Sequence, residues 1–158
     1  MEASDGTASA TRPAHLLDDA ELAAWRGLLR SHARLTRELD VELVSSHGLP
    51  LTSYEVLLFL ADSPEGRLRM SELADSVLLS RSGLTRLVDR LERQDLLRRE
   101  SCPSDRRGSY AAITQRGRAL FDRARVTHLD GVRRRFLSHL SEDELRALGE
   151  LWRRTTGG

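Results

Sequence analysis

The sequence predicts a mainly α-helical fold with one small β-hairpin, and three observations lead to this prediction. Both ends of the 158-residue chain repeat apolar residues at helical spacing over long stretches. Two short helical segments joined by a tight turn lie in the middle of the chain. Two strand-like segments that flank a charged, turn-rich stretch follow them. The expected order of elements is therefore helix, helix, short helix, helix, hairpin, long helix, helix.

The first long helix is expected from Leu17 to about Ser46. It follows residues 1–14, a small and polar stretch without apolar periodicity that is expected to be a flexible tail. His47–Pro50 should end the helix, because Gly and Pro cannot continue it. A helix this long exceeds what a small core can bury, so we expect it to pack against another long helix or a second chain. Its apolar side repeats in a heptad-like way at Leu22, Trp25, Leu29, His32, Leu39 and Leu43.

Three shorter helices should follow, each with its own start signal. Thr52–Glu55 forms a capping-box pattern, and Asp62–Gly66 is a turn. Ser71 is expected to cap a short helix, and Ser80 to cap another that runs to about Gln94. The positions expected to face inward are Val56, Leu57, Phe59, Leu60, Leu73, Ala74, Val77, Leu84, Leu87, Val88 and Leu91.

A basic hairpin is expected next. Leu96–Glu100 and Ser109–Ile113 are its strand candidates, and Cys102–Gly108 would form a long, charged tip. Although the net charge of the whole chain is only +1, residues 80–110 carry eight Arg against five acids. This local excess of positive charge is typical of a nucleic-acid contact.

Two helices should close the chain. Thr114 is expected to cap a long helix to about Leu140, and Ser141–Glu144 is a second capping box. Two short helices followed by a basic hairpin form a winged helix-turn-helix pattern. The expected organisation is a flexible N-terminal tail (1–14), a helical dimerisation region (15–48 and 114–158) and a winged helix-turn-helix DNA-binding lobe (49–113).

The stretch from Met70 to Gly117 resembles the MarR family, the multiple antibiotic resistance regulators. The resemblance implies a triangular homodimer in which N- and C-terminal helices of two chains interlock, with a DNA-binding lobe on each chain and repression as the commonest activity. It rests on five pieces in order, namely Ser71–Ala74, Leu84–Glu92, Leu96–Arg99, Asp105–Gly108, and Ile113–Thr114 with Gly117.

The exposed side of the helix that begins at Ser80 is expected to enter the major groove of double-stranded DNA. Short polar or Arg side chains near the N-terminus of such a helix reach base edges. Asp89 and Arg90 are expected to face phosphates or to pair with each other. The expected contacts of this helix are Ser80, Arg81, Ser82, Thr85, Arg86 and Arg90.

The hairpin tip resembles the wing signature of the family. The resemblance implies that Arg107 enters the adjacent minor groove and that Asp105 braces it, with Arg106 on a phosphate. A narrow, A·T-rich minor groove attracts such an Arg through its negative potential. Arg98 and Arg99 are expected either to contact phosphates or to solubilise an edge strand.

The terminal helices predict an obligate homodimer, with an intrachain helical bundle as the alternative. A two-fold dimer presents two recognition helices to successive major grooves, so the operator should be an inverted repeat. The expected apolar seam comprises Leu22, Leu29, Leu39, Leu43, Leu129, Val132, Phe136, Leu140, Leu148, Leu151 and Trp152.

A small-molecule effector is a further expectation from the resemblance, since many relatives respond to phenolic or anionic ligands held between the dimer helices and the DNA lobe. Residues of the Trp25 and His32 type more often take places in the seam, which is the alternative for both. Oxidation of Cys102 is an alternative sensor, although relatives that sense peroxide usually do so from a cysteine in the first helix. The residues expected to line the ligand site are Trp25, Arg26, Arg30, His32 and Tyr54.

Enzymatic, metal and membrane functions find no support in the pattern. The five His have no metal-ligand spacing, and neither a Gly-rich phosphate loop nor a nucleophile elbow is present, so we expect no catalytic site and no cofactor. A lone cysteine makes no intrachain disulfide, and no run approaches the roughly 18 apolar residues of a membrane span. A cytoplasmic chain is expected. The remaining alternative is a winged-helix protein-interaction module, which usually lacks a charged wing tip.

Overall fold

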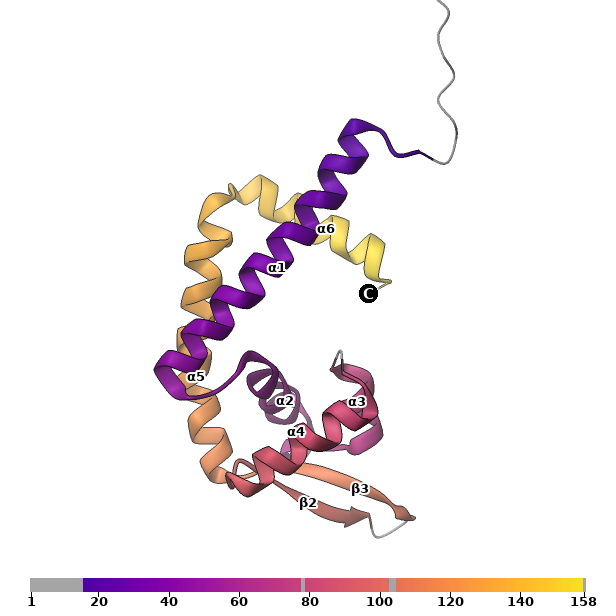
Figure 1. Cartoon of the computed structure of the whole chain (residues 1–158), viewed down its shortest axis with the longest axis vertical. Helices are drawn as coiled ribbons and strands as arrows, with labels where there is room; N and C mark the ends of the chain where they lie inside the picture. Colours follow the sequence, from indigo (N-terminus) through magenta and orange to yellow (C-terminus); the bar gives the residue numbers. More distant parts are fainter. Residues whose placement is uncertain (1–15, 78, 103–104, 158) are drawn as a thin grey trace, which may run out of the picture. The chain divides into compact units, whose positions relative to one another are not determined.

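The computed structural model of the chain describes residues 16–77, 79–102 and 105–157 (Figure 1); of Arg81, Cys102 and residues 105–108 it describes the backbone alone. The chain divides into two compact units, residues 1–34 and 35–158. Across the described ranges, no helix combines the length and the apolar character needed to cross a membrane.

Helix α1 runs from Asp19 to His47, close to its expected range. Asp18 sets its start: Glu21 N–H donates to the Asp18 carboxylate (2.8 Å), and Asp18 N–H donates to the Glu21 carboxylate (2.6 Å). This reciprocal pair satisfies two N–H groups that a helix leaves open. The part of α1 that belongs to the first unit leaves large apolar side chains exposed, including Trp25 and Leu29, at 52% and 48%.

The second unit is a winged helix-turn-helix lobe with long helices, which confirms the expected fold (Figure 1). Its three-stranded antiparallel sheet has the order β1-β3-β2. The chain order of its elements is the end of α1, α2 (Leu51–Asp62), η1 (Pro64–Gly66), β1 (Arg67–Arg69), α3 (Met70–Ser76), α4 (Arg81–Arg93), β2 (Leu97–Cys102), β3 (Asp105–Ile113), α5 (Gln115–Arg135), η2 (Leu137–His139) and α6 (Glu142–Thr156).

Strand β1 is an element that the sequence did not predict. It pairs with β3 from Arg67 opposite Ala112 to Arg69 opposite Tyr110, and both arginines lie over the Tyr110 ring. Three residues are too few to show the alternation that identifies a strand.

The starts of α2 and α3 differ from the prediction. Helix α2 begins at Leu51, before the expected Thr52 capping box, because Asp40 of α1 accepts the Leu51 N–H (2.8 Å). Helix α3 begins at Met70 rather than at a Ser71 cap, since the chain enters it directly from β1. There the Glu72 carboxylate accepts the Arg69 N–H at 3.0 Å.

Three other caps are confirmed. Ser80 Oγ accepts the Gly83 N–H (3.1 Å), and Thr114 Oγ1 accepts the Gly117 N–H (3.0 Å). At the last helix, Ser141 and Glu144 form the expected reciprocal capping box. These caps fix where α4, α5 and α6 begin.

Two ends were predicted wrongly. The hairpin strands continue to Cys102 and from Asp105, so Cys102 and residues 105–108, which were expected in the tip, belong to strands. Antiparallel backbone pairing propagates beyond the apolar residues that identify a strand. Helix α5 ends at Arg135 rather than near Leu140. Phe136 leaves the helical conformation directly after Arg135, and η2 follows. No Gly or Pro marks that break in the sequence.

The core of the second unit contains most of the residues expected to face inward, while Phe59 and Ala74 are only half-buried. Leu39 and Leu43, expected on the seam, are a correction. They are 7% and 0% exposed and belong to the chain's own core, so they are covered without a second chain. The end of α1 is held to α5 by Glu42, whose carboxylate pairs with Arg134 and Arg135 (2.5 Å each).

Helix α5 packs its first turn directly onto the backbone of Leu96. A Cβ at Gly117 would lie 1.9 Å from the Leu96 carbonyl oxygen. The same oxygen accepts the Thr114 N–H at 3.2 Å. Only glycine permits this approach, which joins the end of α4, the start of β2 and the start of α5.

Gly117→Ala is therefore expected to lower the free energy of unfolding by about 3 kcal/mol or more, because the clash is with backbone and cannot be relieved by a rotamer change. Urea unfolding followed by circular dichroism measures the effect. Gly149→Ala is the control, since its Cβ would meet nothing within 4 Å and alanine favours the helix. Equal stability of the two variants would contradict a structural role for the contact between Gly117 and the Leu96 backbone.

An aromatic cluster lies between α2 and α5. The Tyr54 ring lies 5.4 Å from that of Phe121 and 4.6 Å from that of His128. Burial raises the pKa of Tyr54, and burial lowers the pKa of His128. Within the described part of the chain, His128 Nδ1 is buried without a hydrogen-bond partner, which disfavours the charged ring.

Stability should consequently depend on pH through His128. A lowered pKa in the folded state means that the unfolded chain binds the proton more tightly, so stability is complete above about pH 6.5 and falls as the pH drops below it. Urea midpoints between pH 5 and 8 measure this slope. His128→Phe keeps an aromatic ring and should flatten the slope; an unchanged slope would rule out His128 as its source.

Candidate nucleic-acid interface

Helix α4 separates an apolar face from a polar one. Leu84, Leu87, Val88 and Leu91 are buried, as predicted. The opposite face is exposed and carries the side chains expected to contact DNA, namely Ser80, Ser82, Thr85, Arg86 and Arg90. Because the buried face fixes the rotation of the helix, this polar face must point outward.

Local hydrogen bonds order the start of this face. The Oγ atoms of Ser80 and Ser82 lie 3.2 Å apart, and Arg86 Nε donates to the Ser82 carbonyl oxygen at 3.3 Å. The Arg86 stem is thus held against the first turn of α4. That bond occupies only Nε of the five N–H donors of the guanidinium.

A small hollow of about 210 Å³ lies beside α4, lined by Thr52, Leu79, Gly83, Arg86, Leu87 and Arg90. Arg90 donates to Ser53 Oγ (3.3 Å) in the first turn of α2, so it turns away from Asp89. Thr52 is exposed and lines this hollow together with two arginines, Arg86 and Arg90. The sequence analysis missed it, although its position in a helical first turn was a usable signal.

Arg99 on β2 links the hairpin to α4. Its guanidinium pairs with Asp89 (2.6 Å) and Glu92 (2.7 Å), and its N–H donates to Glu92 at 2.8 Å. Burial lowers the pKa of Arg99, but the hydrogen bonds to the two carboxylates raise it by more. The pKa of Arg99 is therefore raised overall. The sequence analysis did not predict this pairing of Arg99 with two carboxylates of α4; the phosphate contact of Arg99 stays a prediction. Asp89 pairs with Arg99, whereas Arg90 donates to Ser53, so the expected pairing of Asp89 with Arg90 is not formed among the described residues.

Arg98 has a carboxylate partner on its own strand. It pairs with Glu100 at 2.8 Å, and Arg67 of β1 approaches the same carboxylate at 3.5 Å. The hydrogen bond from Arg98 is the main cause of the lowered pKa of Glu100. The base of the hairpin is thus neutralised internally.

The tip of the hairpin carries the remaining predicted DNA contacts. Asp105, Arg106 and Arg107 open β3 at the tip end (Figure 1), and Cys102 ends β2 opposite Asp105. The side chains of these residues, and that of Arg81, lie outside the described part of the structure. Their roles stay predictions.

The residues expected at a ligand site fall into different environments. Trp25, Arg26, Arg30 and His32 are exposed on the part of α1 in the first unit. Tyr54 is in the core of the second unit, 2% exposed. In the ranges that the structure describes, no three His, Cys, Asp or Glu residues are grouped so that they could hold a metal ion.

Comparison with known proteins gives consistent results. The sequence model described as "MarR family" matches residues 47–108. The chain is 32% identical over 111 residues to the HTH-type transcriptional regulator MhqR of Bacillus subtilis, covering 70% of this chain and 74% of MhqR. It is 28% identical over 109 residues to the homoprotocatechuate degradative operon repressor of Escherichia coli, covering 69% and 72%.

A solved structure extends the likeness to nearly the whole chain. It is Sco3205, a MarR family transcriptional regulator from Streptomyces coelicolor in complex with DNA. The two chains superpose with a TM-score of 0.84 at 37% identity, and the match covers 89% of each.

Arg99→Gln should test the link between the hairpin and α4. Asp89 is 44% exposed, so water screens the pair, and we expect a loss of about 1 kcal/mol in the free energy of unfolding. DNA affinity should fall as well, because the hairpin loses its attachment. Arg93→Gln, at an exposed position in the last turn of α4, is the control.

Asp89→Asn in combination with Arg99→Gln completes a double-mutant cycle measured by unfolding and DNA binding. If the two residues act together, the second substitution adds little to the first. Fully additive losses would show that the pair does not couple the hairpin to α4.

Proposed function

Because this chain belongs to the MarR family of DNA-binding transcriptional regulators, a non-enzymatic family, we propose that it is a homodimeric repressor released from an inverted-repeat operator by a small phenolic or anionic ligand. The observation that carries the DNA-binding part is the polar outer face of α4 opposite its buried apolar face. A helix presented in this way fits the major groove.

The proposed contacts divide into three groups. Ser80, Arg81, Ser82, Thr85 and Arg86 read base edges or contact phosphates at the start of α4. Arg90 and Thr52 bind a phosphate beside the first turn of α2, which the hollow between them supports. At the wing, Arg107 enters the minor groove, Asp105 braces it, and Arg106 contacts a phosphate.

Homodimerisation is supported by apolar side chains that the chain leaves uncovered. In the first unit these are Trp25, Leu28 and Leu29 of α1. In the second unit, exposed large apolar side chains are Val126 and Leu129 of α5 and Leu151 and Trp152 of α6. Exposed apolar surface of this kind marks an interaction site. A two-fold dimer would then read two half-sites about one helical turn apart.

Repression has support from a relative. The Escherichia coli relative is named as the repressor of an operon for degradation of homoprotocatechuate. A repressor of this kind responds to a ligand only if the ligand binds the DNA-bound and free states unequally. For the proposed family site, Trp25, Arg26, Arg30, His32 and Tyr54 remain the candidate residues.

Fluorescence anisotropy with DNA from upstream of the protein's own gene, against scrambled DNA of equal length at ~150 mM salt, tests the proposal. Arg86→Ala should cost ~1–3 kcal/mol of binding and change the base preference. Arg107→Ala should weaken binding strongly while the dimer stays intact. Arg153→Ala, in the last turn of α6, is the control. If Arg86→Ala lowers the affinity equally for all DNA sequences, Arg86 contacts a phosphate and not a base. If Arg107→Ala leaves the DNA affinity unchanged, the assignment of Arg107 to the minor groove is wrong.

Removal of all residues before Leu29 should weaken dimerisation, since the truncation deletes Trp25 and Leu28 from the exposed apolar side of α1. Light scattering across a dilution series measures the dissociation. The double substitution Arg26→Gln and Arg30→Gln, which alters exposed polar residues of the same segment, is the control. A truncated chain as dimeric as the full one would place the interface elsewhere.

A further inference from the structure

A second hollow lies beside α4, on the side of α3. It has a volume of about 240 Å³ and is lined by Met70, Ser71 and Ala74 of α3 and by Leu84 and Thr85 of α4. We call it the α3–α4 hollow. Its volume is below the roughly 300–1,000 Å³ of sites for drug-sized ligands, so it suits a small chemical group better than a whole small molecule.

The lining of the α3–α4 hollow changes from an apolar floor to an exposed rim. Leu84 is only 2% exposed and forms the floor. Met70 and Ala74 are half-buried, whereas Ser71 and Thr85 are exposed. The hollow therefore opens to the surface at Ser71 and Thr85.

This opening borders the polar face of α4. Ser82, Thr85 and Arg86 are three or four residues apart and so share one side of the helix. At 3.6 residues per turn, Arg90 lies at one edge of that side and Thr85 at the other. The hollow lined by Arg86 and Arg90 thus flanks the polar face toward α2, and the α3–α4 hollow flanks it toward α3.

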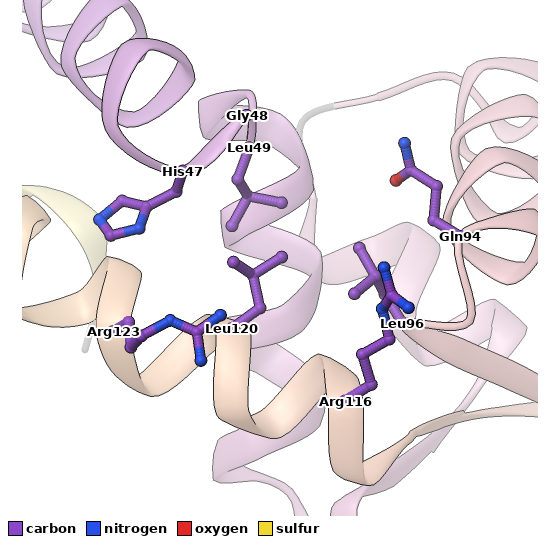
Figure 2. A pocket seen from close by; sticks show the side chains of 8 residues that line it. All are labelled: His47, Gly48, Leu49, Gln94, Leu96, Arg116, Leu120 and Arg123. Carbon is purple, nitrogen blue, oxygen red and sulfur yellow. The ribbon is translucent and has the colours of Figure 1, made fainter.

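The α3–α4 hollow differs in charge from two other hollows of the lobe. Arg86 and Arg90 line the hollow on the α2 side, and Arg116 and Arg123 line the hollow shown in Figure 2. None of the five residues that line the α3–α4 hollow is charged. A phosphate group is a poor occupant, because it would lose water there without gaining a positively charged partner.

The edges of the bases in the major groove offer one apolar group. Guanine, cytosine and adenine present only hydrogen-bond donors and acceptors there, whereas thymine also presents its C5-methyl group. An uncharged hollow with an apolar floor, next to a face that carries hydroxyl and guanidinium groups, is complementary to that methyl group and to no other group of the groove.

We propose that the α3–α4 hollow receives the C5-methyl group of a thymine, and that Thr85 and Ala74 thereby determine the preferred base pair at one position of each half-site. The proposal rests on the proposed function and deepens it. The methyl group of Thr85 contacts the thymine methyl group at the rim. Ala74 keeps the hollow open because its side chain is small, and the flexible thioether of Met70 fits the remaining space.

Substitution of single thymines by deoxyuridine tests the proposal, because deoxyuridine pairs with adenine as thymine does and lacks only the methyl group. A binding site for the full chain is first selected from random duplex DNA at ~150 mM salt. Each thymine of that site is then replaced in turn, and affinity is measured by fluorescence anisotropy. At one thymine of each half-site, we expect deoxyuridine to weaken binding about fourfold, which corresponds to ~0.8 kcal/mol for one buried carbon.

Methylated cytosine provides a second measurement at the same position. When a C·G pair replaces the T·A pair, 5-methylcytosine carries the methyl group at the same place in the groove and unmodified cytosine does not. We expect the 5-methylcytosine site to bind more tightly than the cytosine site, by about the same factor of four.

Two pairs of variants connect the methyl preference to the hollow. Ala74→Val fills the hollow and should reduce the ratio of thymine to deoxyuridine affinity to about one, whereas Ala119→Val, at an exposed position of α5, should keep the ratio. Thr85→Ser removes the methyl group of Thr85 and should lower the ratio, whereas Thr85→Val retains a methyl group and should preserve it. A general loss of stability does not change this ratio, and thermal unfolding checks that each variant folds.

Three results would overturn the proposal. In the first, no thymine of the selected site loses affinity when deoxyuridine replaces it. In the second, Ala74→Val and Thr85→Ser keep the full ratio, so that another part of the protein contacts the methyl group. In the third, Ala74→Val weakens binding to all sites equally without changing the ratio, so that the hollow packs against the DNA backbone.

The same measurements distinguish failure of this proposal from failure of the proposed function. If a specific site is selected but tolerates deoxyuridine throughout, the regulator stands and the methyl site is removed. If the chain selects no specific site from random DNA, both proposals are wrong.

Discussion

The fold depends on one close backbone contact, the packing of Gly117 onto the carbonyl group of Leu96. That carbonyl oxygen also accepts the Thr114 N–H, and the Thr114 hydroxyl donates to the neighbouring Asp95 carbonyl oxygen at 2.6 Å. The three bonds and contacts fix the end of α4, the base of the hairpin and the direction of α5 together. The position of the polar face of α4 therefore depends on this contact at the C-terminal end of the helix, and not only on the apolar residues beneath the face.

Arginine serves two purposes in this chain, and pairing distinguishes them. Arg99, Arg134 and Arg135 meet carboxylates on other elements of the same chain and so join those elements. A second set, exemplified by Arg86, has no ion pair among the described residues and stands beside hollows or on the outer side of α4. A net charge of +1 conceals this division, because it sums paired and unpaired arginines alike with all 24 acids.

The elements that the sequence predicted well are those with a local physical cause. The 3.6-residue repeat of α4 identified both its faces, and Ser80, Thr114 and Ser141 were recognisable as caps from their own side chains. The features that escaped prediction have distant causes. Asp40 starts α2 from another helix, β1 exists because β3 offers a pairing edge, and Arg99 finds its partners across the hairpin. For the same reason, Leu39 and Leu43 looked like seam residues although α5 and the lobe cover them.

Because α5 is one continuous helix, a tilt at its first turn displaces its far end. Its 21 residues run without a kink from the Leu96 joint to Arg135, where Phe136 breaks the helix. Such a helix is about 30 Å long, so a tilt of only about 5° at its first turn carries its far end through about 3 Å. Gly117, which sets the contact with Leu96, therefore lies at the point about which α5 would tilt. In the homodimer proposed above, a displacement of this size would decide whether the two DNA-binding lobes match the helical pitch of DNA.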